Sequence, residues 1–133
     1  MINEPKKVIL HCSDSPQGRG DGAKEIHRWH KMRGWDGIGY NYVIKEDGTI
    51  ENGRPEYWIP AGAKGYNKDT LHICLIGIDS FTDEQFGSLA QLLRDIMIRY
   101  DIRKKNIIGH YMVSNKTCPN FNVPEFLSTK MKG

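Results

Sequence analysis

The segment LHICLIGIDSFTDEQFGSLAQLLRDIMIRYDIRKKNIIGH, residues 71–110, decides the fold class because it predicts a strand, a long helix and a second strand in succession. The opening apolar run predicts a central strand, and NIIGH predicts a short one. Between them Thr82 and Gln85 form a capping box that starts a helix. That helix has one apolar face, made of Phe86, Leu89, Leu92, Leu93, Ile96 and Tyr100. The segment therefore predicts an α/β protein.

Upstream, KKVILHCS at residues 6–13 predicts a buried strand. Alternation puts Ile9 and His11 on one face of it. The opposite face then carries Val8, Leu10 and Cys12. His11 is expected near the C-terminal end of this strand, which is where sites of α/β sheets usually lie.

Three further elements complete the prediction. The sequence 23–34 predicts a helix that buries Ile26, Trp29 and Met32 and stops at Gly34. A hairpin is predicted at 40–53 and a final short helix at 123–131. Because strands and helices alternate, we expect residues 1–133 to form a single domain with a mixed central sheet flanked by helices.

The composition is that of a folded, soluble chain. Hydrophobic residues make up 38% of the 133 residues and charged residues 26%. No apolar run is long enough to cross a bilayer, and the N-terminus lacks the features of a signal peptide, so we expect synthesis in a cytoplasm and no membrane partner. The net charge of +3 is mild and its charges are interspersed, so no nucleic-acid partner is expected. Three cysteines cannot form a fully paired disulfide framework and are expected to be thiols.

The loop GHYMVSNKTCPNF, residues 109–121, brings together residue types that bind metals and stabilise anions. His110 and Cys118, with His11 from the first strand, form a possible two-histidine, one-cysteine set. Zinc accepts such ligands and keeps its fourth position for water in catalytic sites. No compact metal motif is present, so the residues alone leave two readings open, a metal site or separate packed side chains.

Other histidines offer a rival set. His27 and His30 lie three apart on the predicted helix, but no third ligand is close in sequence. We expect His30 to be packed and hydrogen-bonded and His27 to be exposed. His72 and Cys74 share one face of the central strand, and we expect a buried pair without a metal.

The chain resembles the zinc-dependent N-acetylmuramoyl-L-alanine amidases of the bacteriophage lysozyme type, which are related to animal peptidoglycan recognition proteins. The resemblance is carried by ILHCS, by EIHRWHKMRGWDGIGYNYVIKEDGTIENGR, and by AKGYN, ICLIG and KTCPNF. It implies that His11, His110 and Cys118 bind one Zn²⁺ per chain. It also implies that Tyr40 lies beside the attacking water and that Lys116 is catalytic.

The resemblance further implies a substrate, peptidoglycan, and a reaction, hydrolysis of the amide bond between N-acetylmuramic acid and L-alanine of the stem peptide. Trp58, Lys64 and Asn67 are expected substrate contacts. We expect a monomeric phage or prophage endolysin that acts on the cell wall after its release. The alternatives are a recognition module that binds peptidoglycan without cutting it and, from the basic surface alone, a nucleic-acid or protein regulator.

The chain departs from the family pattern at three places. Many relatives have a histidine where Gly62 stands, and many have a glycine where His72 stands. The stretch 111–115, YMVSN, lacks the acidic and proline residues frequent in relatives. These departures leave the expected ligands intact and bear on the substrate contacts and the position of the loop.

Overall fold

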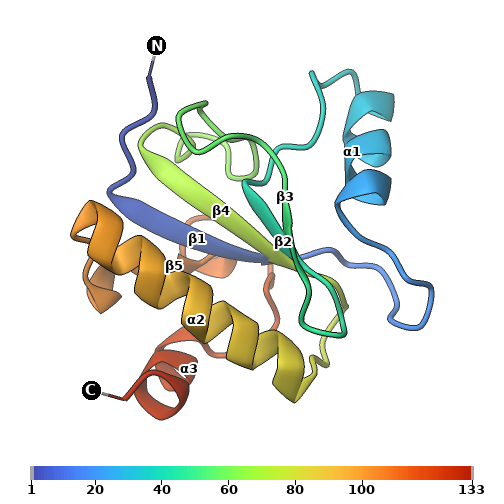
Figure 1. The fold of residues 1–133 in the computed structure, drawn as a ribbon. Coiled ribbons are helices and arrows are strands. Elements are labelled where there is room, and N and C mark those ends of the chain that lie inside the picture. Colours follow the sequence, from blue (N-terminus) through green and yellow to red (C-terminus); the bar gives the residue numbers. More distant parts are fainter. Residues whose placement is uncertain (1, 133) are drawn as a thin grey trace.

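The computed structural model describes residues 2–132, which form a five-stranded sheet in the order β3-β2-β4-β1-β5 (Figure 1). The strands are β1 (Lys7–Cys12), β2 (Tyr42–Ile44), β3 (Ile50–Asn52), β4 (Thr70–Leu75) and β5 (Ile107–Gly109). Four strands are parallel to one another, namely β2, β4, β1 and β5. The edge strand β3 pairs antiparallel with β2. The sheet is therefore mixed, as the sequence predicts, and its parallel strands end at one common edge.

Helices cover both faces of the sheet. They are α1 (Ala23–Met32), α2 (Asp83–Tyr100) and α3 (Val123–Lys130), with the short 3₁₀ turns η1 (Lys104–Asn106) and η2 (His110–Met112). α2 and α3 pack on the face that carries Leu10, Ile73 and their neighbours. Figure 1 shows both helices on the same side of the sheet and α1 apart from them. α1 packs through Ile26 against a smaller cluster on the opposite face.

The start of α2 is fixed as its sequence predicts. The Gln85 amide donates its N–H to Thr82 Oγ1 at 3.1 Å, and the Thr82 amide donates to Gln85 Oε1 at 3.0 Å. The fully buried Gln85 side chain also donates to the carbonyls of Ile44 and Ile76. The capping residue therefore also joins the helix to the ends of β2 and β4.

One predicted core residue of α1 is wrong. Met32 is 80% exposed, whereas Ile26 and His30 are buried. Ile26 and His30 are four residues apart and lie on one face, while Met32 lies about 200° around the helix from His30. His30 is held on the inner face because its Nδ1 accepts the N–H of Gly39 at 2.9 Å.

A partly exposed ion pair anchors the loop that follows β3. Glu56 accepts two hydrogen bonds from the Arg99 guanidinium, at 2.7 and 2.8 Å, and it also accepts from the hydroxyls of Tyr42 and Tyr100. These bonds, with Arg99 foremost, lower the pKa of Glu56 to about 2. The loop is thereby tied to β2 and to the C-terminal end of α2.

We expect Glu56→Gln to lower the free energy of unfolding at pH 7 by roughly 1–3 kcal/mol. A pKa lowered from 4.5 to about 2 is equivalent to roughly 3 kcal/mol, and solvent screening reduces this because Arg99 is 39% exposed. Since the folded-state pKa is depressed, the stabilisation is present above pH 4.5 and is lost as the pH falls towards 2. Urea unfolding between pH 2 and 7 measures it.

The control is Asp95→Asn, which removes the other, more exposed partner of Arg99. It is expected to cost at most about 0.5 kcal/mol, as exposed helix pairs do. Equal losses in the two variants would contradict the role assigned to Glu56.

Candidate metal centre

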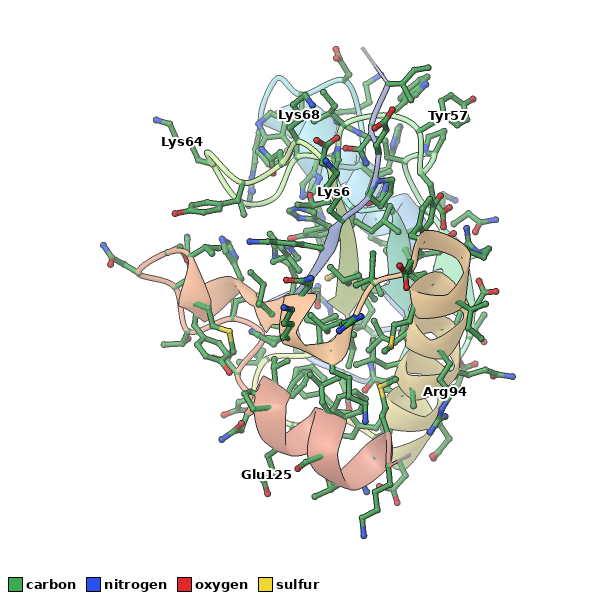
Figure 2. All side chains as sticks on the ribbon, turned by 90° about the vertical axis from the view of Figure 1, so that its left-hand side faces the viewer. Lys6, Tyr57, Lys64, Lys68, Arg94 and Glu125 are labelled. Atoms are coloured by element: carbon green, nitrogen blue, oxygen red, sulfur yellow. The ribbon has the colours of Figure 1, made fainter. Side chains whose placement is uncertain are left out.

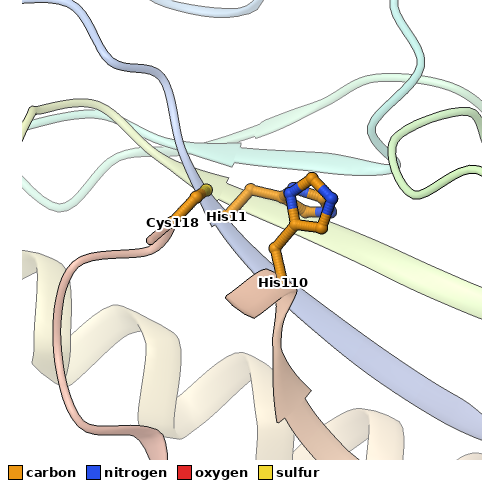
Figure 3. A group of neighbouring side chains, drawn as sticks. All are labelled: His11, His110 and Cys118. Atoms are coloured by element: carbon orange, nitrogen blue, oxygen red, sulfur yellow. The ribbon is translucent and has the colours of Figure 1, made fainter. Parts of the chain in front are cut away.

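Three possible metal ligands meet at the common edge of the parallel strands. His11 lies in β1, His110 follows β5 directly, and Cys118 lies in the loop before α3 (Figure 3). The β1–β5 register pairs Leu10 with Gly109, so the next residue of each strand is a histidine at the same level. One ligand atom from each of the three side chains lies within 4.8 Å of the others.

Cys118 reaches this position because its loop folds back onto β1. The Tyr111 amide donates to the Cys118 carbonyl at 2.8 Å. The Cys118 Sγ accepts the backbone N–H of Cys12 at 2.9 Å. A backbone N–H directed at sulfur favours the thiolate, which is the form that binds metals.

The protonation states suit a cation. Burial lowers the pKa of His11 well below its usual value, and burial together with the Lys116 ammonium lowers the pKa of His110. Both imidazoles are therefore neutral at pH 7 and have a free lone pair. The interaction with the Cys12 side chain and burial raise the pKa of the Cys118 thiol, outweighing the backbone N–H of Cys12, which lowers it, so a divalent cation that binds here displaces the thiol proton.

The donor set fits zinc. Two imidazole nitrogens and one sulfur are ligands that zinc accepts tetrahedrally, and three protein ligands are typical of catalytic zinc sites. Bonds of about 2.0–2.3 Å place tetrahedral ligand atoms about 3.4–3.6 Å apart. The three ligand atoms, all within 4.8 Å of one another, need to approach by about 1.4 Å at most. Among residues 2–132 no other group of three such ligands exists.

The ligands open onto a cavity of about 380 Å³ that also contains Tyr40 and Lys116. The Tyr40 ring lies 4.8 Å from the His11 ring, centre to centre. Burial raises the pKa of Tyr40 well above 10, so its hydroxyl keeps its proton at neutral pH. Lys116 is exposed at the rim, with its charge close enough to act on His110. The structure thus brings all five predicted metal and catalytic residues to one cavity.

Ser114 organises the loop 111–115, where the chain departs from the pattern of the family that it resembles. Its hydroxyl donates to the His110 carbonyl at 3.0 Å and accepts the Lys116 amide N–H at 3.1 Å. One side chain therefore links a predicted ligand to the predicted catalytic lysine. From the sequence, only the lack of acidic and proline residues at 111–115 was noted, and the serine within that stretch was the feature that could have pointed to these contacts.

The three predicted substrate contacts do not lie together in this cavity. Trp58 is 54% exposed and lines a separate hollow. Lys64 is exposed and projects from its loop (Figure 2). The Asn67 side chain accepts the N–H groups of Gly62 and Ala63, so it shapes the loop. The substrate contacts stay predictions.

Arg33 and Trp35 are among the residues that line the cavity and were not predicted from the sequence. They follow the end of α1, and the Arg33 guanidinium lies over the Trp35 ring at 5.8 Å. The sequence feature that could have pointed to them is Gly34, which they flank and where the helix changes to a turn with a φ of +88°.

The remaining histidines and Cys74 are placed as predicted, with one addition. His27 is exposed, His30 is buried and hydrogen-bonded, and Cys74 is buried. His72 is buried too, but its partner is His11, whose Nε2 lies 2.7 Å from His72 Nδ1. Burial lowers the pKa of His72 to about 3.

Known proteins are similar to this chain over most of its length. The family model described as N-acetylmuramoyl-L-alanine amidase matches residues 2–121. The endolysin of Escherichia phage T7 is 37% identical over 124 residues, covering 87% of this chain and 81% of that protein. The endolysin of Enterobacteria phage K11 is 34% identical and covers 95% of the chain and 87% of its own length. The solved structure of the N-acetylmuramoyl-L-alanine amidase LysC from Clostridium intestinale URNW superposes with a TM-score of 0.87 at 31% identity, covering 97% of this chain and 87% of that one.

Proposed function

The chain belongs to the N-acetylmuramoyl-L-alanine amidase family, and from this membership we propose how its side chains hydrolyse peptidoglycan. It is a peptidoglycan hydrolase of the endolysin type. It cleaves the amide bond between N-acetylmuramic acid and L-alanine of the stem peptide. One observation carries the proposal for the site, namely that the three ligand atoms lie in the same cavity as Tyr40 and Lys116.

His11, His110 and Cys118 hold one zinc ion. The proposal is supported by the neutral imidazoles and by the sulfur that accepts a backbone N–H. When bound in such a site, zinc acts as a Lewis acid and makes water nucleophilic at neutral pH.

Tyr40 and Lys116 carry the parts of the reaction that the chain itself supplies. The protonated Tyr40 hydroxyl orients the attacking water by a hydrogen bond and takes part in moving its proton to the leaving amine. The Lys116 ammonium pairs with the negative charge that develops on the scissile carbonyl oxygen. Neither role needs a serine or cysteine nucleophile, since Cys118 is a ligand in this proposal.

The enzyme acts on the cell wall after release, as a monomer. Its phage endolysin relatives support the place of action. Within residues 2–132, no helix has both the length and the apolar character needed to cross a membrane. Size-exclusion chromatography with light scattering tests the monomer.

Mass spectrometry of fragments released from purified peptidoglycan tests the function. We expect free stem peptides that begin with an unblocked L-alanine, and we expect a zinc chelator to stop their release. Zinc repletion restores it, because the ligands remain in place. Fragments cut between sugars would contradict the amidase activity, and bound zinc with no released peptide would support the recognition module instead.

A further inference from the structure

A second histidine lies directly behind the predicted ligand His11. His72, in β4, faces the same side of the sheet, and the two rings stack with centres 4.8 Å apart. His11 Nε2 and His72 Nδ1 are 2.7 Å apart. Both residues are buried, His11 at 1% and His72 at 0% exposure. Such a contact between two buried imidazoles needs one shared proton, so one nitrogen donates and the other accepts.

The direction of that hydrogen bond follows from the contact that the other ring nitrogen of His72, Nε2, makes with Thr70. The Thr70 hydroxyl donates to the Asn67 carbonyl at 2.6 Å, because a carbonyl can only accept. Thr70 Oγ1 therefore accepts from His72 Nε2, which lies 2.9 Å away. A neutral imidazole carries one ring proton, which is then on Nε2 of His72, and its Nδ1 accepts. His11 consequently donates from Nε2 and keeps the lone pair on Nδ1.

Gly62 completes this arrangement. A side chain at position 62 would put its Cβ 2.5 Å from His72 Nδ1 and 3.1 Å from His11 Cε1. Any residue but glycine would therefore press on the hydrogen bond between the rings. The two departures from the family pattern, at 62 and 72, are thus neighbours in space. Gly62 leaves the space that the His72 ring occupies.

We propose that His72 is a positioning residue that fixes the ring orientation and tautomer of His11 and so presents Nδ1 to the metal. The hydrogen bonds run from His11 through His72 and Thr70 to the Asn67 carbonyl. A metal-binding histidine whose other N–H is held by a fixed acceptor binds more tightly than a free one. The inference deepens the proposed function and rests on its zinc site.

A matched pair of substitutions separates positioning from packing. His72→Asn keeps an acceptor oxygen at about the place of Nδ1, whereas His72→Leu has nearly the same shape and no acceptor. Zinc affinity is measured by competition with a chromophoric chelator. We expect His72→Leu to bind zinc about 10–100-fold more weakly than the parent, in line with the loss of an outer hydrogen-bond partner of a ligand. His72→Asn is expected to recover most of that loss.

A spectroscopic test reads the tautomers without metal. Long-range ¹H–¹⁵N correlation spectra of the metal-free parent are expected to show both His11 and His72 protonated on Nε2. Thr70→Val, which removes the hydroxyl acceptor and keeps the shape, is expected to change the His72 pattern and to weaken zinc binding. This variant also tests the proposal if His72→Leu does not fold, as judged by thermal unfolding.

The outcomes distinguish this inference from the function on which it rests. Suppose that the parent binds zinc and releases stem peptides, but that His72→Leu and His72→Asn have the same zinc affinity. The positioning role is then wrong and the function stands. A His72 protonated on Nδ1 in the parent would also overturn the inference. If the parent binds no zinc, the proposed function fails and the inference with it.

Discussion

Cys118→Ala is expected to abolish both zinc binding and wall lysis. The substitution removes the only sulfur among the three proposed ligands and leaves two histidines, and catalytic zinc sites use three protein ligands. Lysis of purified peptidoglycan should fall by about 1,000-fold or more, because the water nucleophile is no longer available at neutral pH. Zinc content by mass spectrometry and lysis by turbidity are measured on the same preparation.

His27→Ala is the control for this experiment. His27 is exposed and belongs to no group of three ligands among residues 2–132. Its Nδ1 accepts only the N–H of Ile38 among the hydrogen bonds described, so the variant should keep its zinc and lyse nearly as well as the parent. A Cys118→Ala protein with full zinc and full activity would refute the ligand set, and a metal-free His27→Ala protein would mean that the wrong histidines were assigned.

Lys116→Met should keep its zinc and lose most of its turnover. The substitution retains the length and apolar stem of lysine and removes the charge. Since the ammonium is assigned to the developing oxyanion, kcat should fall by about 100–1,000-fold, the usual effect of losing one such donor. Zinc affinity should not fall, because a nearby positive charge opposes a cation and also lowers the pKa of His110.

Lys105→Met is the matched control, since Lys105 is also exposed but lies in η1, outside the cavity. It should leave kcat unchanged. If Lys116→Met retained kcat within about threefold, the oxyanion role would be wrong and Lys116 would be an ordinary surface charge.

Local chemistry made much of the fold predictable. The Thr82–Gln85 capping box and the apolar spacing of α2 act within one helix, so they can be read without a partner. Alternation in β1 correctly separates His11 from Leu10. The predicted burial of Met32 was wrong because the apolar pattern does not show where the buried face of a helix ends. The contact of His30 with the loop at Gly39 decides which face is buried.

The residues of the candidate site were easier to predict than the contacts around them. His11, His110 and Cys118 were identified through a family resemblance, and the structure brings their ligand atoms together. The role of Ser114 and the contact of His72 with His11 were not seen, because both depend on which loop and which strand lie next to the ligand.

By itself, the sequence determined the elements, the class of the sheet and the residue types available for a metal, since these depend on interactions between residues close along the chain. Only the tertiary structure decided the strand order, which places β4 beside β1 and His72 behind His11 although 61 residues separate them. It likewise decided that Gly62 faces that pair of rings. The reason is physical: a strand's own pattern specifies which face is buried but not which neighbour it pairs with, and pairing is set by the packing of the whole core.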